Sequence, residues 1–141
     1  MSLVPFLRVA FIFCIVALCV LAWLPGDELM RTPLGMGRSS LSHLVGHAEH
    51  VLAYLGTTIV MGLALRGRVR LGVQCILLAS YAAILEVGQI YSPGRHASVA
   101  DLAFSAVGIA FGGLLLWIMP TLYQVWGKKV QALQRDNRPA G

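Results

Sequence analysis

The residues of this chain that could do chemistry gather in one polar stretch between two long apolar runs. Glu86, Gln89, Arg95, Asp101 and Ser105 follow one another there. Ionisable side chains beside hydrocarbon are costly to keep, so each one is a hypothesis about function with a partner to be found. Glu86 and Asp101 could act as general acid and base in a partly dry site, and Arg95 could bind an anionic group such as a phosphate. We therefore predict a polar site in this stretch.

A second polar set lies upstream at helical spacing. His43, His47, His50 and Tyr54 recur at steps of four, three and four, so a helix places all of them on one face. His50 is a third acid or base candidate. The three histidines are also ligand types that suit zinc, but the pattern favours a hydrogen-bonded histidine face, and we predict no metal and no cofactor.

The composition indicates a membrane protein. Of the 141 residues, 57% are hydrophobic and only 12% are charged, which lies outside the range of soluble domains. A helix needs roughly 20 apolar residues to cross a bilayer. Four stretches reach or approach that length: Leu3 to Leu24, Leu44 to Leu65, Leu71 to Tyr91, and Val99 to Met119. We predict an all-α fold, a bundle of four transmembrane helices in one domain over residues 1–120, with a basic cytoplasmic tail at 121–141.

The basic residues predict the topology. Arg66, Arg68 and Arg70 crowd a short turn between the second and third apolar runs, and such turns face the cytoplasm. Both termini are then cytoplasmic, and the polar stretch lies at the outer face. The net charge of +5 is explained by these segments, so we predict no nucleic-acid partner. Arg8 is close enough to the start of the first span to reach the interface by snorkelling.

The fourth span carries a stripe of small residues in phase with its carboxylate. Asp101, Ser105, Gly108 and Gly112 recur at steps of four, three and four. A Gly-x-x-x-Gly pattern allows close approach of two membrane helices. We predict a helix contact on this face, and a homo-oligomer through Gly108 and Gly112 is one form that it could take.

Taken together, these motifs resemble the VanZ-like family of small bacterial membrane proteins. The resemblance covers about residues 43 to 113 and lies in the joint spacing of His50-x-x-x-Tyr54, Glu86-x-x-Gln89, Pro-Gly-Arg95, Asp101 and Gly108. It implies a compact multi-helix protein of the bacterial cytoplasmic membrane with a role in the cell envelope. The family's namesake is associated with low-level resistance to the glycopeptide teicoplanin.

The chain departs from the family pattern in two places, a residue pair and a single residue. Gly46 and His47 stand where the family usually has an Asp-Lys pair, and Ser105 stands where it usually has an asparagine. The missing lysine removes a fixed positive charge, although His47 can supply a titratable one.

The expected ligand is a membrane lipid, a lipid-linked envelope precursor or a glycopeptide-type molecule. The predicted binding residues are His50, Tyr54, Glu86, Gln89, Arg95, Asp101 and Ser105. Three alternatives stay open at this point. The same residues could form a membrane enzyme acting on a lipid phosphate or a lipid-linked sugar, the charges could be a structural network only, or the chain could be the structural partner of another membrane protein. A transporter is disfavoured because the polar groups lie near one face.

Overall fold

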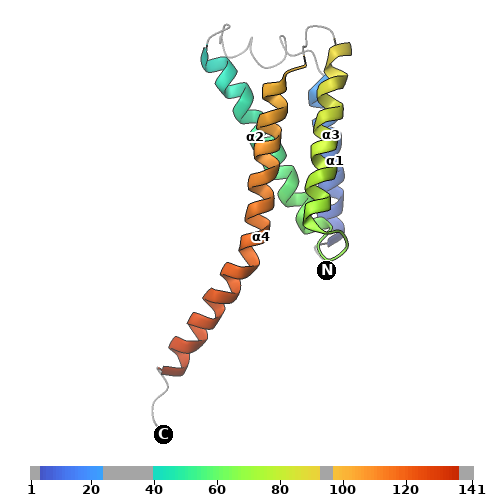
Figure 1. Cartoon of the computed structure of the whole chain (residues 1–141). Coiled ribbons are helices and arrows are strands. Elements are labelled where there is room, and N and C mark those ends of the chain that lie inside the picture. The colour runs from blue at the N-terminus through green and yellow to red at the C-terminus, as the bar shows by residue number, and fades with distance from the viewer. Residues whose placement is uncertain (1–3, 24–39, 93–96, 137–141) are drawn as a thin grey trace.

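Four α-helices make up the computed structural model (Figure 1). It describes residues 4–23, 40–92 and 97–136, with side chains described outside 40–45 and 121–136. The helices are α1 (Val4–Trp23), α2 (Ser40–Ala64), α3 (Leu71–Gly88), which a single 3-10 turn η1 (Gln89–Tyr91) extends, and α4 (Val99–Asp136). The described residues contain no strand. The predicted all-α class is therefore confirmed.

Three helices are long and apolar enough to cross a membrane, as expected of a membrane protein. They are Val4–Trp23, Leu71–Tyr91 and Val99–Pro120. The second predicted span is different. α2 has 25 residues, a length of roughly 37 Å, but it does not qualify as an apolar span over its described residues. Its first half contains His47, Glu49 and His50.

The helices alternate in direction, so they form two parallel pairs. The starts of α2 and α4 and the ends of α1 and α3 lie at one end of the bundle (Figure 1). We call this the polar end, because it holds His47 and Asp101. At the opposite end, the turn end, a short turn over residues 65–70 joins α2 to α3. Gly67 has a φ of 77° in this turn, a left-handed conformation that glycine adopts without strain.

The parallel pair α2 and α4 is in close backbone contact. A Cβ built on Gly108 would lie 2.4 Å from the carbonyl oxygen of Val51, and one built on Gly112 would lie 2.7 Å from the Cβ of Thr58. Further along, a Cβ on Gly62 would meet the side chain of Leu116. The predicted helix contact on the glycine stripe is confirmed, and it lies within one chain.

The other parallel pair, α1 and α3, is spaced by large side chains. The Tyr81 hydroxyl donates a hydrogen bond of 2.8 Å to the carbonyl oxygen of Ile15. At the polar end, the Ser92 hydroxyl donates to the carbonyl oxygen of Trp23 at 3.2 Å, and the Trp23 ring lies beside Gly88. The two bonds give nearly the same register, so α1 and α3 run side by side over most of their length.

All four helices contribute to one hydrophobic core, whose buried members are Leu18, Tyr54, Met61, Leu78, Ala82, Leu85 and Ile109. Many other large apolar side chains point outward, among them Phe13, Ile76 and Trp117. An apolar exterior around a packed centre is what a bilayer solvent requires.

α4 does not end at the predicted boundary. It runs as one helix through Pro120 to Asp136, and its second half leaves the bundle (Figure 1). A proline removes one backbone hydrogen bond and bends a helix without always ending it. The predicted division at residue 120 therefore falls within a helix.

Candidate functional site

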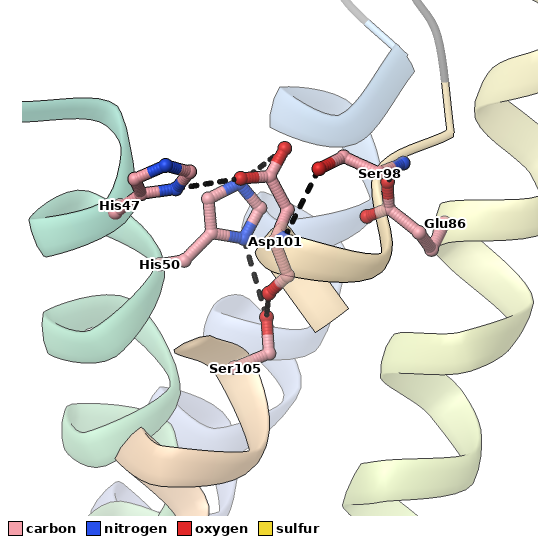
Figure 2. Close-up of polar contacts among 6 residues, drawn as sticks. All are labelled: His47, His50, Glu86, Ser98, Asp101 and Ser105. Carbon is pink, nitrogen blue, oxygen red and sulfur yellow. Dashed lines mark hydrogen bonds and ion pairs between the residues drawn. The ribbon is translucent and has the colours of Figure 1, made fainter. Parts of the chain in front are cut away.

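The polar groups of α2, α3 and α4 meet at the polar end. Figure 2 shows His47 and His50 reaching from α2 toward Asp101 and Ser105 on α4, with Glu86 of α3 on the far side of Ser98. The helical stripes of α2 and α4 bring these side chains together because the two helices run parallel in one register. His47 pairs with Asp101, and His50 with Ser105.

Asp101 is held between two imidazole rings. His47 Nδ1 lies 3.0 Å from one carboxylate oxygen, and His50 Nε2 lies 4.0 Å from the other. The three side chains are 26%, 27% and 26% exposed, for His47, His50 and Asp101 in turn. The His47 ring also stacks on Phe104, with centroids 4.4 Å apart and planes 22° from parallel. Carboxylate and aromatic ring together fix the orientation of His47.

The hydrogen bonds of Ser105 define the tautomer of His50. The Ser105 hydroxyl donates its one proton to the carbonyl oxygen of Asp101 at 2.8 Å, so it accepts in its 3.2 Å bond with His50 Nδ1. Neutral His50 therefore carries its proton on Nδ1, and its Nε2 faces the Asp101 carboxylate. Ser105 is 2% exposed and its proton is committed, so this hydroxyl is a support for His50.

Ser98 connects the Glu86 carboxylate to the backbone of Asp101. It precedes α4, and its hydroxyl accepts a hydrogen bond of 3.3 Å from the backbone N–H of Asp101, as an N-cap residue does. In a capping box, the acidic residue three positions on would accept from the N–H of the cap. Here Glu86 takes that N–H instead. The Asp101 carboxylate is thereby released to bind the histidines.

Glu86 has a structural position that the sequence did not specify. It is buried at 7% exposure, and its carboxylate lies at the N-terminus of α4, where the helix dipole favours a negative charge. It reaches Asp101 through Ser98. Arg95, which the sequence placed between the two carboxylates, lies outside the described residues.

The remaining predicted ligand residues support the site from inside the bundle. Tyr54 is 5% exposed, belongs to the hydrophobic core and lies within electrostatic range of Glu86. Gln89 is also buried, and its carbonyl oxygen accepts from the N–H of Ser92 at 3.0 Å. Both side chains are therefore buried in the bundle.

Within the described residues, no group of three or more histidine, cysteine or acidic side chains is arranged to hold a metal ion. His47 and His50 both converge on Asp101, and the side chain of His43 lies outside the described set. The described histidines form hydrogen bonds with Asp101 and Ser105.

The glycine stripe of α4 packs against α2 of the same chain. Gly108 and Gly112 are buried against α2, and this contact is what brings Asp101 and Ser105 to the histidines. An oligomer through these glycines stays a prediction, and it would require α2 to move aside.

Sequence reasoning missed Ser98, which donates its N–H to the Glu86 carboxylate and caps the helix that carries Asp101. The available signal was the pattern Ser98-x-x-Asp101, a capping-box spacing at the start of an apolar run. The arrangement as a whole is a partly exposed carboxylate with two imidazole rings, supported by buried polar residues. Such a group can bind a polar head or transfer a proton.

Comparison of the chain with protein-family models, with curated proteins and with solved structures finds no match in any of the three. The resemblance to VanZ-like proteins therefore stays a prediction.

Proposed function

We propose that this protein is a component of the bacterial cell envelope, with a role similar to that of VanZ-like proteins, and that its polar end binds the anionic head of a lipid or lipid-linked precursor. In this proposal all four helices cross the cytoplasmic membrane, both termini are cytoplasmic and the polar end faces outward. The basic turn at Arg66 to Arg70 supports this orientation. α4 packs over the polar stripe of α2, and this supports the proposal that α2 crosses the membrane.

One observation carries the binding proposal: the reactive edge of the site is exposed while its supports are buried. His47, His50 and Asp101 each keep about a quarter of their surface open, whereas Ser105 and Glu86 are 2% and 7% exposed. An open edge on a rigid base is suited to a ligand.

The histidines supply the positive side of such a site. Nδ1 of His47 is engaged by Asp101, and its Nε2 has no hydrogen-bond partner among the described residues. When His47 is protonated, this Nε2–H is a donor directed away from Asp101, and a phosphate or carboxylate oxygen can accept from it. Arg95 would add a second donor from the adjoining loop, as the sequence predicts. Asp101 orients the rings.

A second candidate function is acid–base catalysis on the same class of ligand. The observation that favours it is the pairing of Asp101 with the titrating nitrogen of His50, 4.0 Å apart. Asp101 would stabilise the imidazolium after His50 has taken a proton from water or a hydroxyl attacking the head group. Binding and catalysis share the same first step, so one experiment can separate them.

The test is native mass spectrometry of the detergent-purified protein, which reports lipids that remain bound. The variants are His47→Gln with His50→Gln together, Asp101→Asn alone and Arg95→Ala alone. We expect the wild type to retain an anionic lipid, and the double histidine variant to lose it by about tenfold, because the Nε2–H donor of His47 and the positive charge of both imidazolium rings are gone. Thr57→Val is the matched control, because it removes a buried hydroxyl of α2 that bonds only to Ala53 of its own helix.

The outcomes separate the two functions. Identical lipid content in the wild type and a folded double histidine variant would exclude the binding proposal. If Asp101→Asn retains the lipid but the wild type alone converts it on incubation, the catalytic candidate holds. If Asp101→Asn loses the lipid and no conversion occurs with the wild type, the site is a binding site.

A further inference from the structure

The turn end of the bundle carries an arginine on a buried stripe. Phe11, Ile15, Leu18 and Ala22 are the α1 residues that pack in or against the hydrophobic core. Arg8 continues this stripe three residues before Phe11, so it faces the bundle. It is half-buried, and its Nε is shielded from solvent without a hydrogen-bond partner. Instead of snorkelling away from the protein, Arg8 keeps part of its guanidinium group inside.

Gln74 occupies the equivalent place on α3. It is 2% exposed, and its amide nitrogen donates a hydrogen bond of 2.8 Å to the carbonyl oxygen of Val69 in the turn. Its Oε1 is buried and accepts no hydrogen bond. A buried amide oxygen without a donor costs about 1–3 kcal/mol. Arg8 Nε and Gln74 Oε1 are the two buried side-chain atoms of the described residues that lack a partner.

The helix register places these two atoms at the same depth. Tyr81 of α3 donates to the carbonyl oxygen of Ile15 of α1. Arg8 precedes Ile15 by seven residues, and Gln74 precedes Tyr81 by seven residues. Seven residues are close to two helical turns, so each polar residue lies on the same face as its partner in that contact and about 10 Å below it. An unpaired donor and an unpaired acceptor thus stand level with each other on two parallel helices.

Among the residues whose side chains are described, those at the turn end carry positive charge and no carboxylate. Arg66, Arg68 and Arg70 are exposed in the turn, and the first turn of α3 has no side-chain cap. The carboxylates whose side chains are described all lie toward the polar end. A water molecule could satisfy the two orphan atoms, but it would leave the charge of Arg8 without a counter-ion. An anion would supply that counter-ion.

We propose that Arg8 and Gln74 form a second site, which binds the head group of an anionic phospholipid that also carries a hydroxyl, such as phosphatidylglycerol. The phosphodiester oxygen accepts from Arg8, and the hydroxyl of the head group donates to Gln74 Oε1. This site lies at the opposite end of the bundle from Asp101 and does not depend on the function proposed for that end.

The test uses the full chain in nanodiscs of phosphatidylcholine with one added lipid. Phosphatidylglycerol is compared with phosphatidylmethanol, which carries the same charge on a phosphodiester but no hydroxyl. Lipid retained on release into detergent is measured by native mass spectrometry. We expect the wild type to enrich phosphatidylglycerol about tenfold over phosphatidylcholine, and more strongly than it enriches phosphatidylmethanol.

Three variants divide the interaction into its parts. Arg8→Gln should lose the preference for both anionic lipids. Gln74→Leu should keep the preference for anionic lipid but bind the two anionic lipids equally. Arg66→Gln is the matched control, because it removes an exposed charge from the same end and should leave the preference for phosphatidylglycerol within about twofold of wild type.

A thermal measurement guards against a folding artefact. Phosphatidylglycerol should raise the unfolding temperature of the wild type and not that of Arg8→Leu, because a ligand stabilises only the state that binds it. Equal enrichment by the wild type and Arg8→Gln, or an equal thermal shift in the wild type and Arg8→Leu, overturns the proposal. Displacement of the lipid by millimolar glycerol phosphate overturns the assignment to lipid and assigns the site to a soluble phosphate ester.

Discussion

The two parallel helix pairs of this bundle are joined in opposite ways. α2 and α4 approach until glycine Cα atoms face backbone, with no room for a Cβ at Gly108. α1 and α3 are held apart by the side chains of Trp23 and Tyr81, each of which takes part in one contact between the pair. The first pair ends in the partnered cluster around Asp101, and the second ends in two atoms without partners.

The difference shows what close approach does for polar groups in a membrane. Where backbones touch, short side chains such as Ser105 and Asp101 reach the opposite helix and satisfy its histidines. Where large side chains separate the helices, polar groups at the ends are left to find partners elsewhere. The tight pair therefore builds its own site, and the loose pair leaves a place for a third molecule.

The largest expected effect comes from adding one methyl group to the tight pair. Gly108→Ala places a Cβ against the carbonyl oxygen of Val51, which cannot turn away because it belongs to the helix backbone. We expect the free energy of unfolding to fall by roughly 2–3 kcal/mol, measured by reversible unfolding in mixed micelles. Gly56→Ala on α2 is the control, because its Cβ meets nothing within 4 Å. Equal stability of the two variants would show that α2 and α4 are not in close contact.

A smaller effect is expected at the cap that organises the polar end. Ser98→Ala removes the acceptor for the N–H of Asp101 and should cost about 1 kcal/mol. Hydrogen exchange of the Asp101 amide should become faster, while exchange at Leu78 in the core should not. Ser98→Thr retains a hydroxyl and should restore most of the loss. Unchanged exchange at Asp101 in Ser98→Ala would mean that another group caps α4.

The smallest effect is expected in the loose pair. Gly88→Ala brings a Cβ within 3.3 Å of the Trp23 ring, a side chain that can shift by a few tenths of an ångström. The gain in helix propensity offsets this shift, so the free energy of unfolding should change by less than about 0.5 kcal/mol. A loss comparable to that of Gly108→Ala would show that both pairs are tightly packed, which would remove the contrast.

Periodicity was sufficient to predict the helices and the faces that meet. The steps of four, three and four in α2 and α4 placed His47, His50, Asp101 and Ser105 on facing stripes, and the structure brings these residues into contact. This worked because a helical stripe fixes direction along the whole element. The apolar runs gave α1, α3 and the first part of α4 with nearly correct bounds.

The remaining features depend on contacts that no local pattern contains. The N–H of Ser98 donates to Glu86 of another helix, whereas the capping-box pattern alone predicts that it donates to Asp101 of the same helix. Arg8 and Gln74 lie far apart along the chain, and only the register of α1 and α3 brings them to the same level. The continuation of α4 past Pro120 reflects the tolerance of an established helix for one missing hydrogen bond.

The continuous α4 also has a mechanical consequence. Residues 121–136 form a lever of roughly 24 Å attached to the helix that carries Asp101. Pro120 removes the backbone bond to Leu116, so the shaft is most compliant at that point. A force on residues 121–136 should bend α4 at Pro120 and leave the first turn of α4 in place. The polar end would then be insulated from whatever pulls on this segment, and Pro120→Ala should couple the two.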